Sequence, residues 1–299
     1  MKSGRRTGSG DWAFRIANYA FFALFTLTCV FPFYYLFINT ISSNDLSAAG
    51  YVTFYPREIH FGNYRNVLQI DGLAQAAYVS LYRTVVGTLL TVGASAFLGY
   101  LFTKREMWLR KLWYRMVVVT MYFSAGLIPW YITMDNLGLT NNYLAYVLPT
   151  IIVPFNIILV KTFVEALPSS LEESAALDGA GYSRIFASII VPLITPILAT
   201  ITIFSAVNQW NAFIDTAFLM TDTKYYTLQF LLWRYLNEST SLAALIRNSQ
   251  DMAASLQHMQ TPTSVRMTVT MIVVLPILIV YPFFQRFFVR GILIGAVKG

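Results

Sequence analysis

The stretch EESAALDGAGYSRIFASIIVPLITP, residues 172–196, begins acidic and alanine-rich, passes two glycines and ends as an apolar run. Ser170 followed three residues later by Glu173 fits a capping box, in which each side chain satisfies a free backbone N–H of a new helix. Alanine is a strong helix former, and glycine can end a helix with positive φ. We therefore expect one short helix of about two turns, ended by Gly179 and Gly181. A second helix is expected from Tyr182 onward.

The composition predicts that lipid surrounds much of the chain. Of its 299 residues, 57% are hydrophobic and 12% are charged, whereas soluble domains carry about 25% charged residues. The net charge is +7, but no basic run is long enough to predict nucleic-acid binding. The lone Cys29 excludes an internal disulfide and a cysteine metal cluster.

Six apolar stretches are long enough to cross a bilayer, which takes about 20 residues as a helix. We therefore predict an all-α, polytopic membrane protein consisting of a single domain over residues 1–299. The acidic stretch lies in the loop 168–185, after the fourth span. The predicted spans are residues 13–39, 78–103, 113–134, 143–165, 186–208 and 267–289.

The positions of the basic residues predict the orientation, because cytoplasmic loops carry the excess of Lys and Arg. With both termini inside, fourteen lysines and arginines fall in inner segments and five in outer segments. The loop 168–185 is then cytoplasmic, and the two long segments 41–76 and 210–265 are outside. The outer segment 210–265 contains LQFLLWRYL, which is expected to lie at the membrane surface or to form a short external helix.

A short, capped helix of small residues in a cytoplasmic loop has two interpretations. It is either a solvated connector or a rigid peg that fits a groove of another protein. The glycines on its C-terminal side and its small side chains favour the peg, because a connector needs neither.

The same stretch resembles the EAA loop of ABC importer permeases, whose pattern is Glu-Ala-Ala, three residues, Gly, nine residues, Ile, one residue and Leu-Pro. This chain has Glu173-Ser174-Ala175, then Gly179, Ile189 and Val191-Pro192, so serine and valine replace one alanine and the leucine. IPWYITMDNLGLTNN at 128–142, WNAF at 210–213 and YPFFQRFFVRGILIGAVKG at 281–299 resemble other parts of carbohydrate importer permeases, such as the small maltose-type permease and permeases for polysaccharide fragments.

The resemblance implies a fold, a function and partners. The fold is that of type I ABC importer permeases, with six transmembrane helices and a cytoplasmic coupling helix. The chain would form half of the translocation path of an ATP-driven sugar importer in a prokaryotic cell membrane. The partners would be a second, non-identical permease, two ATPase subunits that bind ATP and Mg²⁺, and an external solute-binding protein. The coupling residues would be Glu172, Glu173, Ala175, Ala176, Asp178, Gly179, Gly181 and Arg184.

Polar and aromatic side chains inside the spans are candidates for a sugar path: Tyr122, Ser124, Tyr131, Asn156, Asn208, Gln209, Trp210 and Asn211. Tyr131 and Trp210 also fit the aromatic belt at the lipid interface. Asn156 follows Pro154 and could instead satisfy backbone groups freed by that proline. Arg83 is expected to extend toward the outer interface, and binding of an acidic sugar is its alternative.

Other function classes lack their motifs. The sequence contains no GxxxxGK[ST] phosphate loop and no GxSxG elbow, and His60 and His258 are isolated. No acidic residue lies at the centre of a predicted span, which disfavours a proton-coupled carrier. We therefore expect no enzyme activity, bound cofactor or metal in this chain. An ABC importer permease for a non-sugar solute remains the alternative function.

Overall fold

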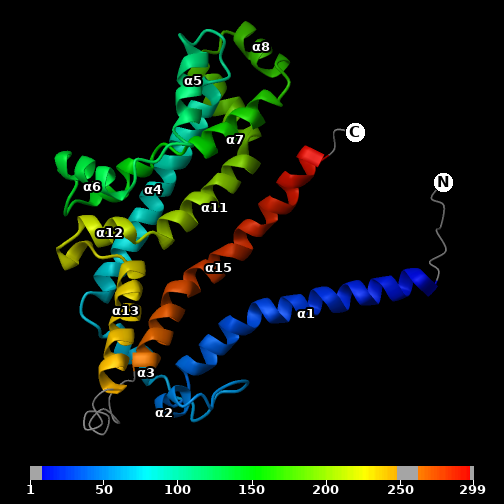
Figure 1. Cartoon of the computed structure of the whole chain (residues 1–299). Coiled ribbons are helices and arrows are strands. Elements are labelled where there is room, and N and C mark those ends of the chain that lie inside the picture. The colour runs from blue at the N-terminus through cyan, green and yellow to red at the C-terminus, as the bar shows by residue number, and fades with distance from the viewer. Residues whose placement is uncertain (1–8, 248–261, 297–299) are drawn as a thin grey trace. The chain divides into compact units, whose positions relative to one another are not determined.

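The computed structural model describes residues 9–247 and 262–296, and within these ranges every regular element is a helix (Figure 1). His258 and the middle of the outer segment 210–265 lie outside the described residues. The chain divides into two compact units, one of Met1–Gln69 with Tyr235–Ile272 and one of Ile70–Arg234 with Val273–Gly299. Two helices, α13 (Leu228–Arg247) and α15 (Pro262–Ala296), pass from one unit into the other.

The first unit contains a 32-residue helix, α1 (Ser9–Thr40), followed by α2 (Asn44–Ala48) and α3 (Gly62–Leu68). The C-terminal end of α1 is held by polar contacts with the segment that follows. The buried Asn39 donates to the carbonyl of Val52 at 3.2 Å and accepts from the hydroxyl of Ser47 at 2.7 Å. The amide of Asn63 donates to the carbonyl of Thr40, one of the acceptors that a helix end leaves without an intrahelical partner.

The second unit is built around α4 (Leu73–Leu101), which packs against α7 (Pro154–Glu165) and α11 (Thr195–Asn211). Two glycines allow these close approaches. A Cβ added to Gly99 would lie 2.6 Å from the side chain of Val160 on α7, and one added to Gly87 would lie 2.4 Å from the side chain of Gln209 on α11.

The remaining helices of the second unit gather near the two ends of α4 (Figure 1). Near its C-terminal end lie α5 (Arg110–Val119) and α8 (Ser170–Leu177), while α6 (Leu127–Asn136) and α12 (Ile214–Leu219) lie nearer the other end. Short pieces complete the unit: η1 (Tyr143–Tyr146), η2 (Leu148–Thr150), α9 (Tyr182–Ile185), η3 (Phe186–Ile190, π-helical), α10 (Val191–Leu193) and η4 (Thr223–Tyr225).

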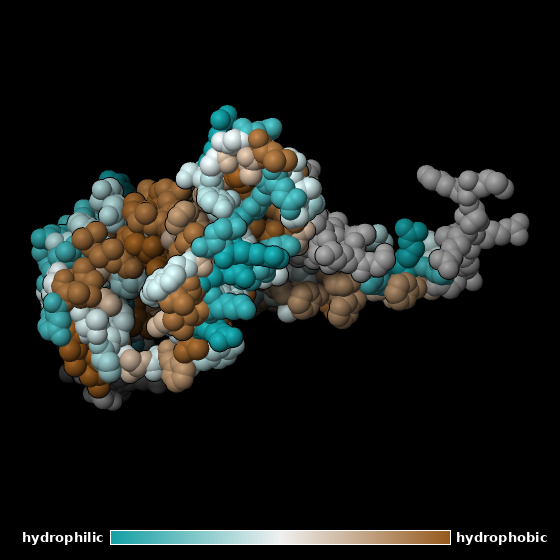
Figure 2. Space-filling model, turned by 90° about the horizontal axis from the view of Figure 1, so that it is seen from above, coloured by the Kyte–Doolittle hydropathy of each residue, from teal (hydrophilic) through white to brown (hydrophobic). Residues whose placement is uncertain are grey.

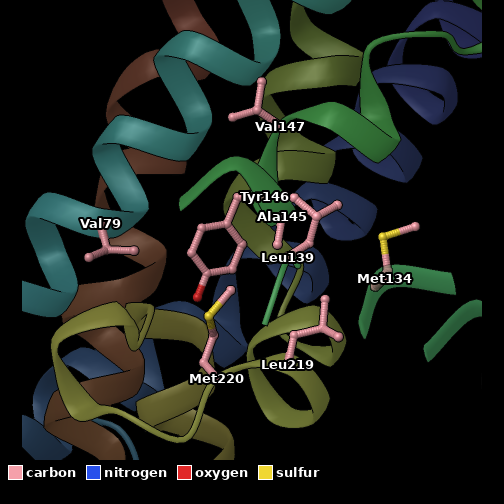
Figure 3. Packing of buried hydrophobic residues seen from close by; sticks show 8 residues of the cluster. All are labelled: Val79, Met134, Leu139, Ala145, Tyr146, Val147, Leu219 and Met220. Atoms are coloured by element: carbon pink, nitrogen blue, oxygen red, sulfur yellow. The ribbon is translucent and has the colours of Figure 1, made fainter. Parts of the chain in front are cut away.

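Two clusters of buried apolar side chains form the core of this unit. One surrounds Tyr146 and includes Val79, Leu139 and Leu219 (Figure 3). The other joins Tyr100 and Val160 to Ile190 and Ile201. Many large apolar side chains nevertheless remain exposed, and they cover much of the surface in Figure 2. Such a surface is typical of a chain that is surrounded by lipid.

Length and apolarity qualify three described helices as membrane spans: Asp11–Thr40, Leu73–Leu101 and Thr263–Val280. They correspond to the first, second and sixth predicted spans. The fourth predicted span is a broken pair, Tyr143–Thr150 and Pro154–Glu165, bent by 44°. The break coincides with Pro154, which follows the extended Val153 and starts α7.

The third predicted span, 113–134, is not one continuous helix. It comprises α5 and α6, with residues 120–126 between them in turn and irregular conformation. Gly126 has φ 87° and ψ 178°, a combination that is essentially restricted to glycine. Pro129 then lacks the N–H that a continuous helix would need, and its ring would clash with the preceding turn. Both residues lie within the apolar run that predicted one continuous span, so the break was not predicted.

The fifth predicted span, 186–208, is also broken. The pieces Tyr182–Leu193 and Thr195–Asn211 meet at 80°. Pro196 has no N–H for the carbonyl of Pro192, and the hydroxyl of Thr195 donates to that carbonyl instead, at 2.8 Å. The bend is therefore a stable feature with its backbone acceptor satisfied. The expectation that one helix would run from Tyr182 through this span is wrong.

Candidate functional site

The acidic stretch forms α8, a helix of eight residues with Glu172 and Glu173 in its first turn. Carboxylates at this end interact favourably with the helix dipole. The predicted capping box is wrong, because Ser170 already lies inside the helix and Ser169 occupies the N-cap without a side-chain cap hydrogen bond. The main-chain carbonyl of Ser169 accepts from the N–H groups of Glu172 and Glu173.

The C-terminal end of α8 is a Schellman motif. The N–H of Ala180 donates to the carbonyl of Ala175, and the N–H of Gly179 donates to that of Ala176, both at 3.0 Å. Gly179 has φ +81°, as the sequence predicts. Gly181 does not: its φ is −74° in extended conformation, and it caps α9 by accepting from the N–H groups of residues 184 and 185. One glycine therefore ends the first helix and the other begins the second.

The helix α8 is attached to the rest of the unit along one side. Glu172 forms an ion pair with Lys104, which follows α4, and the Lys104 ammonium lies 4.1 Å from the centre of the Tyr100 ring. Ala175 and Ala180 pack against the cluster around Tyr100 and Val160. A hollow of about 550 Å³ lies between α8, the end of α7 and the segment that follows α4.

Most of the predicted coupling residues are exposed. Glu172 and Ala175 are half-buried, and six are exposed: Glu173, Ala176, Asp178, Gly179, Gly181 and Arg184. Glu173 and Ala176 also line the hollow. Leu177 is 89% exposed, although it is apolar and lies in a short helix with a fixed end. Leu177 was not named as a candidate from the sequence. The pattern that could have indicated it is a large apolar residue between Ala176 and Asp178.

The candidate path residues on α11 divide between two faces. Gln209 is buried on the face that packs against α4, whereas Asn208 and Asn211 are exposed together with Phe204 and Val207. Trp210 is half-buried, and its indole N–H donates to the carbonyl of Val273 at 3.0 Å. The structure therefore does not place all of the candidates on one surface.

The remaining path candidates lie on other elements. Asn156 is buried and donates to the hydroxyl of Ser205 at 3.3 Å, which makes a link between α7 and α11. Ser124 and Tyr122 are exposed in the irregular segment between α5 and α6, and Tyr131 is exposed on α6. Tyr122 has 79% of its surface exposed.

Arg83 is the centre of a buried polar network that sequence reasoning missed. It is 1% exposed, so the expectation that it extends toward the interface is wrong. Its two terminal nitrogens contact both carboxylate oxygens of Asp215, at 2.6 and 3.0 Å. It also donates to the side-chain oxygen of Gln209 at 3.2 and 3.3 Å and to the carbonyl of Ala212 at 3.1 Å.

The network continues through neighbouring side chains. Gln209 donates to the hydroxyl of Thr150 at 2.7 Å, and the ring of Tyr146 lies 4.6 Å from the Arg83 guanidinium carbon. The Tyr146 hydroxyl donates to the carbonyl of Tyr225 and accepts from Thr216. The ring of Tyr146 projects between Val79 and the segment around Met220 (Figure 3). An arginine next to a carboxylate on a distant element has no local sequence signature, which is why the pair was not predicted.

The sequence matches a known protein family over most of its length. The profile of the family described as "Binding-protein-dependent transport system inner membrane component" matches residues 92–294. The chain belongs to this family. It is therefore a permease subunit of an ABC importer, with the all-α type I permease fold that the resemblance implied.

Individual relatives match this permease along nearly its whole length. The polygalacturonan/rhamnogalacturonan transport system permease protein YtcP of Bacillus subtilis is 33% identical over 96% of this chain and 98% of its own. The arabinooligosaccharides transport system permease protein AraQ of the same organism is 25% identical, with 96% of each chain covered. A chain of a bacterial ABC transporter involved in the import of the acidic polysaccharide alginate is 27% identical, with a TM-score of 0.83, and the alignment covers 95% of this permease and 100% of that chain.

Proposed function

We propose that this permease forms half of the translocation path of an importer for acidic oligosaccharides. The observation that carries the proposal is the 33% identity, over nearly the full length of both chains, with a permease named for polygalacturonan and rhamnogalacturonan transport. A solved relative, 27% identical, belongs to an importer of alginate, which is also an acidic polysaccharide. Both relatives are therefore named for a saccharide cargo that is negatively charged.

The exposed part of α8 is proposed as the surface that docks on an ATPase subunit. A docking helix must transmit displacement without bending, and the Schellman motif at Gly179 gives α8 a fixed end. The exposed side chain of Leu177 gives this surface an apolar contact that a partner groove would cover. Glu173, Asp178 and Arg184 add exposed charges around it.

The attachments of α8 provide routes from this surface into the spans. The ion pair between Glu172 and Lys104 connects α8 to the end of α4. Ala175 and Ala180 contact the buried cluster shared by α4, α7 and α11. A movement of the ATPase subunit would therefore reach three membrane helices through contacts within one compact unit.

The exposed amides of Asn208 and Asn211 are proposed to line the path. Amide groups are costly to place against hydrocarbon without partners, so a face of a spanning helix that carries two of them is expected to adjoin a polar space. A saccharide loses hydrogen bonds to water when it enters such a space, and side-chain amides can donate and accept in replacement.

The remaining partners and the orientation belong to the same proposal. A second, non-identical permease completes the path, an external solute-binding protein delivers the cargo, and two ATPase subunits bind ATP and Mg²⁺. Both termini and α8 lie on the cytoplasmic side of the cell membrane, as the distribution of Lys and Arg predicts. The chain itself carries no cofactor and catalyses no reaction, so the purified permease alone should not hydrolyse ATP.

Reconstitution tests the cargo. The permease would be placed in proteoliposomes with its second permease, its ATPase and its binding protein, and uptake of trigalacturonate would be compared with that of maltotriose. We expect ATP-dependent uptake of trigalacturonate and at least about a tenfold lower rate for the uncharged sugar, equivalent to about 1.4 kcal/mol. An ATPase variant without its phosphate-loop lysine is the control.

Two results would contradict parts of this proposal. Uptake of maltotriose alone would retain a saccharide importer and exclude the preference for acidic cargo. ATP-dependent uptake of an amino acid or polyamine with neither sugar transported would replace the saccharide by a non-sugar solute.

A further inference from the structure

Arg83 has all five of its N–H groups engaged within the permease. The Nε–H donates to Gln209, one terminal nitrogen donates to Asp215 and the carbonyl of Ala212, and the other donates to Asp215 and Gln209. An arginine offers five donors in a fixed planar arrangement, so none is left for a cargo. The charge is also compensated, because the side chain of Asp215 is only 14% exposed and faces it directly.

These contacts join the two sides of the break that ends α11. Ala212 is the C-cap residue of α11 and has extended backbone, with ψ 134°. Its carbonyl accepts from Arg83, while Asp215 lies beyond the break, in the first turn of α12, where it also accepts from the N–H of Thr216. One side chain on α4 therefore fixes both the end of α11 and the start of α12.

The final turn of α11 is fixed in rotation as well. Gln209 is held between Arg83 and Thr150, at 3.2 Å and 2.7 Å respectively. A Cβ at position 87 would lie within 2.4–3.2 Å of three atoms of the Gln209 side chain, so Gly87 is what permits this placement. Since Gln209 faces α4, its neighbours Asn208 and Asn211 must point elsewhere.

We propose that Arg83 is a positioning residue for the translocation path: with Asp215 and Gln209, it holds the final turn of α11 so that Asn208 and Asn211 face the polar space. This inference rests on the proposed function of those two amides. Arg83 does not touch the cargo. It acts through the register of α11, and no sequence motif marks it.

Thiol labelling tests the placement independently of transport. In a Cys29→Ser background, which removes the one native cysteine, Asn211→Cys and Ser205→Cys report the exposed and the buried face of α11. The assembled transporter in membranes would be treated with a water-soluble, membrane-impermeant maleimide. With Arg83 present, residue 211 should react at least about tenfold faster than residue 205, as expected for an exposed against a buried position.

The decisive variant is Arg83→Met/Asp215→Leu, which removes both charges and leaves no buried unpaired ion, so that it can fold even if Arg83→Met alone does not. In this variant the final turn of α11 is no longer held by Arg83 and Asp215. We therefore expect the ratio of the two labelling rates to fall at least about threefold, since small changes in the free energy of local opening change the exposure of a residue by such factors. Arg65→Met, an identical replacement at an exposed position of α3, should leave the ratio unchanged.

The labelling results distinguish the positioning role of Arg83 from the proposed role of Asn208 and Asn211 in the path. If residue 211 labels rapidly and the double variant keeps the original ratio, the positioning role of Arg83 is overturned while the path remains. If residue 211 fails to label with Arg83 intact, the proposed path face is itself wrong, and the inference falls with it.

Discussion

The Arg83 network and α8 are both polar features of the second unit, but they differ in how many of their polar groups find partners within the chain. Arg83 is 1% exposed, and each of its donors is satisfied inside the chain. The helix α8 has one internal ion pair, whereas its exposed part carries charges and a Leu177 that is 89% exposed. The difference indicates two kinds of element, one completed by folding and one that a partner must complete.

The largest effect is expected from Asp215→Ala, because it leaves Arg83 buried without its counter-charge. Removing one partner of a buried ion pair costs about 3–5 kcal/mol. The midpoint of thermal unfolding in detergent should fall markedly, without any ATPase subunit present. Glu165→Ala, which removes an exposed partner of Lys161 on α7, should change it little, since such pairs contribute about 0.3–0.5 kcal/mol. Equal midpoints for the two variants would show that the network is not needed for folding.

These two regions also show how far the sequence could predict the molecule. The pattern from Glu173 to Gly179 predicted the short helix and its end at Gly179, because helix termini are specified by neighbouring residues. The six apolar stretches predicted the all-α membrane fold, and the resemblance of residues 173–192 to the EAA loop implied its type. The breaks near Gly126 and Ile194 were not predicted, although glycine or proline residues mark both. An apolar run of sufficient length predicts a membrane span whether or not the helix is interrupted within it. The pair of Arg83 and Asp215 lies beyond such reasoning, since 132 residues separate its members and only the packed fold brings them together.

The next effect concerns the rigid end of α8. Gly179→Val places a β-branched residue at φ +81°, where the left-handed conformation costs about 1–2 kcal/mol, and it endangers two hydrogen bonds of about 0.5–1.5 kcal/mol each. The variant should remain in the membrane but lose uptake and the capture of the ATPase subunit. Gly179→Asn should retain much of both, because asparagine tolerates positive φ.

The end of α6 offers a matched control for this substitution. Gly138 has φ +67°, and the N–H of Leu139 donates to the carbonyl of Met134 in the same motif that ends α8. A Cβ at either glycine would meet no atom within 4 Å, so neither substitution adds a Cβ clash to the backbone strain. Gly138→Val should keep ATPase capture. If Gly179→Val does so too, the shape of α8 is irrelevant to docking.

A smaller effect is expected from Leu177→Ala. Burying a leucine side chain contributes about 1.5–3 kcal/mol, so affinity for the ATPase subunit should fall about tenfold or more, while the thermal stability of the isolated permease stays the same. Leu137→Ala removes a side chain that is 66% exposed after α6, and it should change neither quantity. Titration of the detergent-solubilised permease with labelled ATPase would measure both affinities. An unchanged affinity for Leu177→Ala would exclude this side chain from the docking surface.

The smallest effect should come from the ion pair that ties α8 to α4. The side chains of Lys104 and Glu172 are 13% and 27% exposed, so the pair is partly shielded from solvent and is expected to contribute about 0.5–1 kcal/mol. Lys104→Glu should lower the number of cargo molecules transported per ATP by about two- to fivefold, because it replaces attraction between α8 and the end of α4 by repulsion. The exchanged variant Lys104→Glu/Glu172→Lys should recover most of the loss, whereas the same exchange of Lys161 and Glu165 on α7 should have no effect on this ratio. If Lys104→Glu and Lys104→Glu/Glu172→Lys have the same transport ratio, the charge at position 104 acts without Glu172. The movement of α8 would then have to reach α4 through the contacts of Ala175 and Ala180.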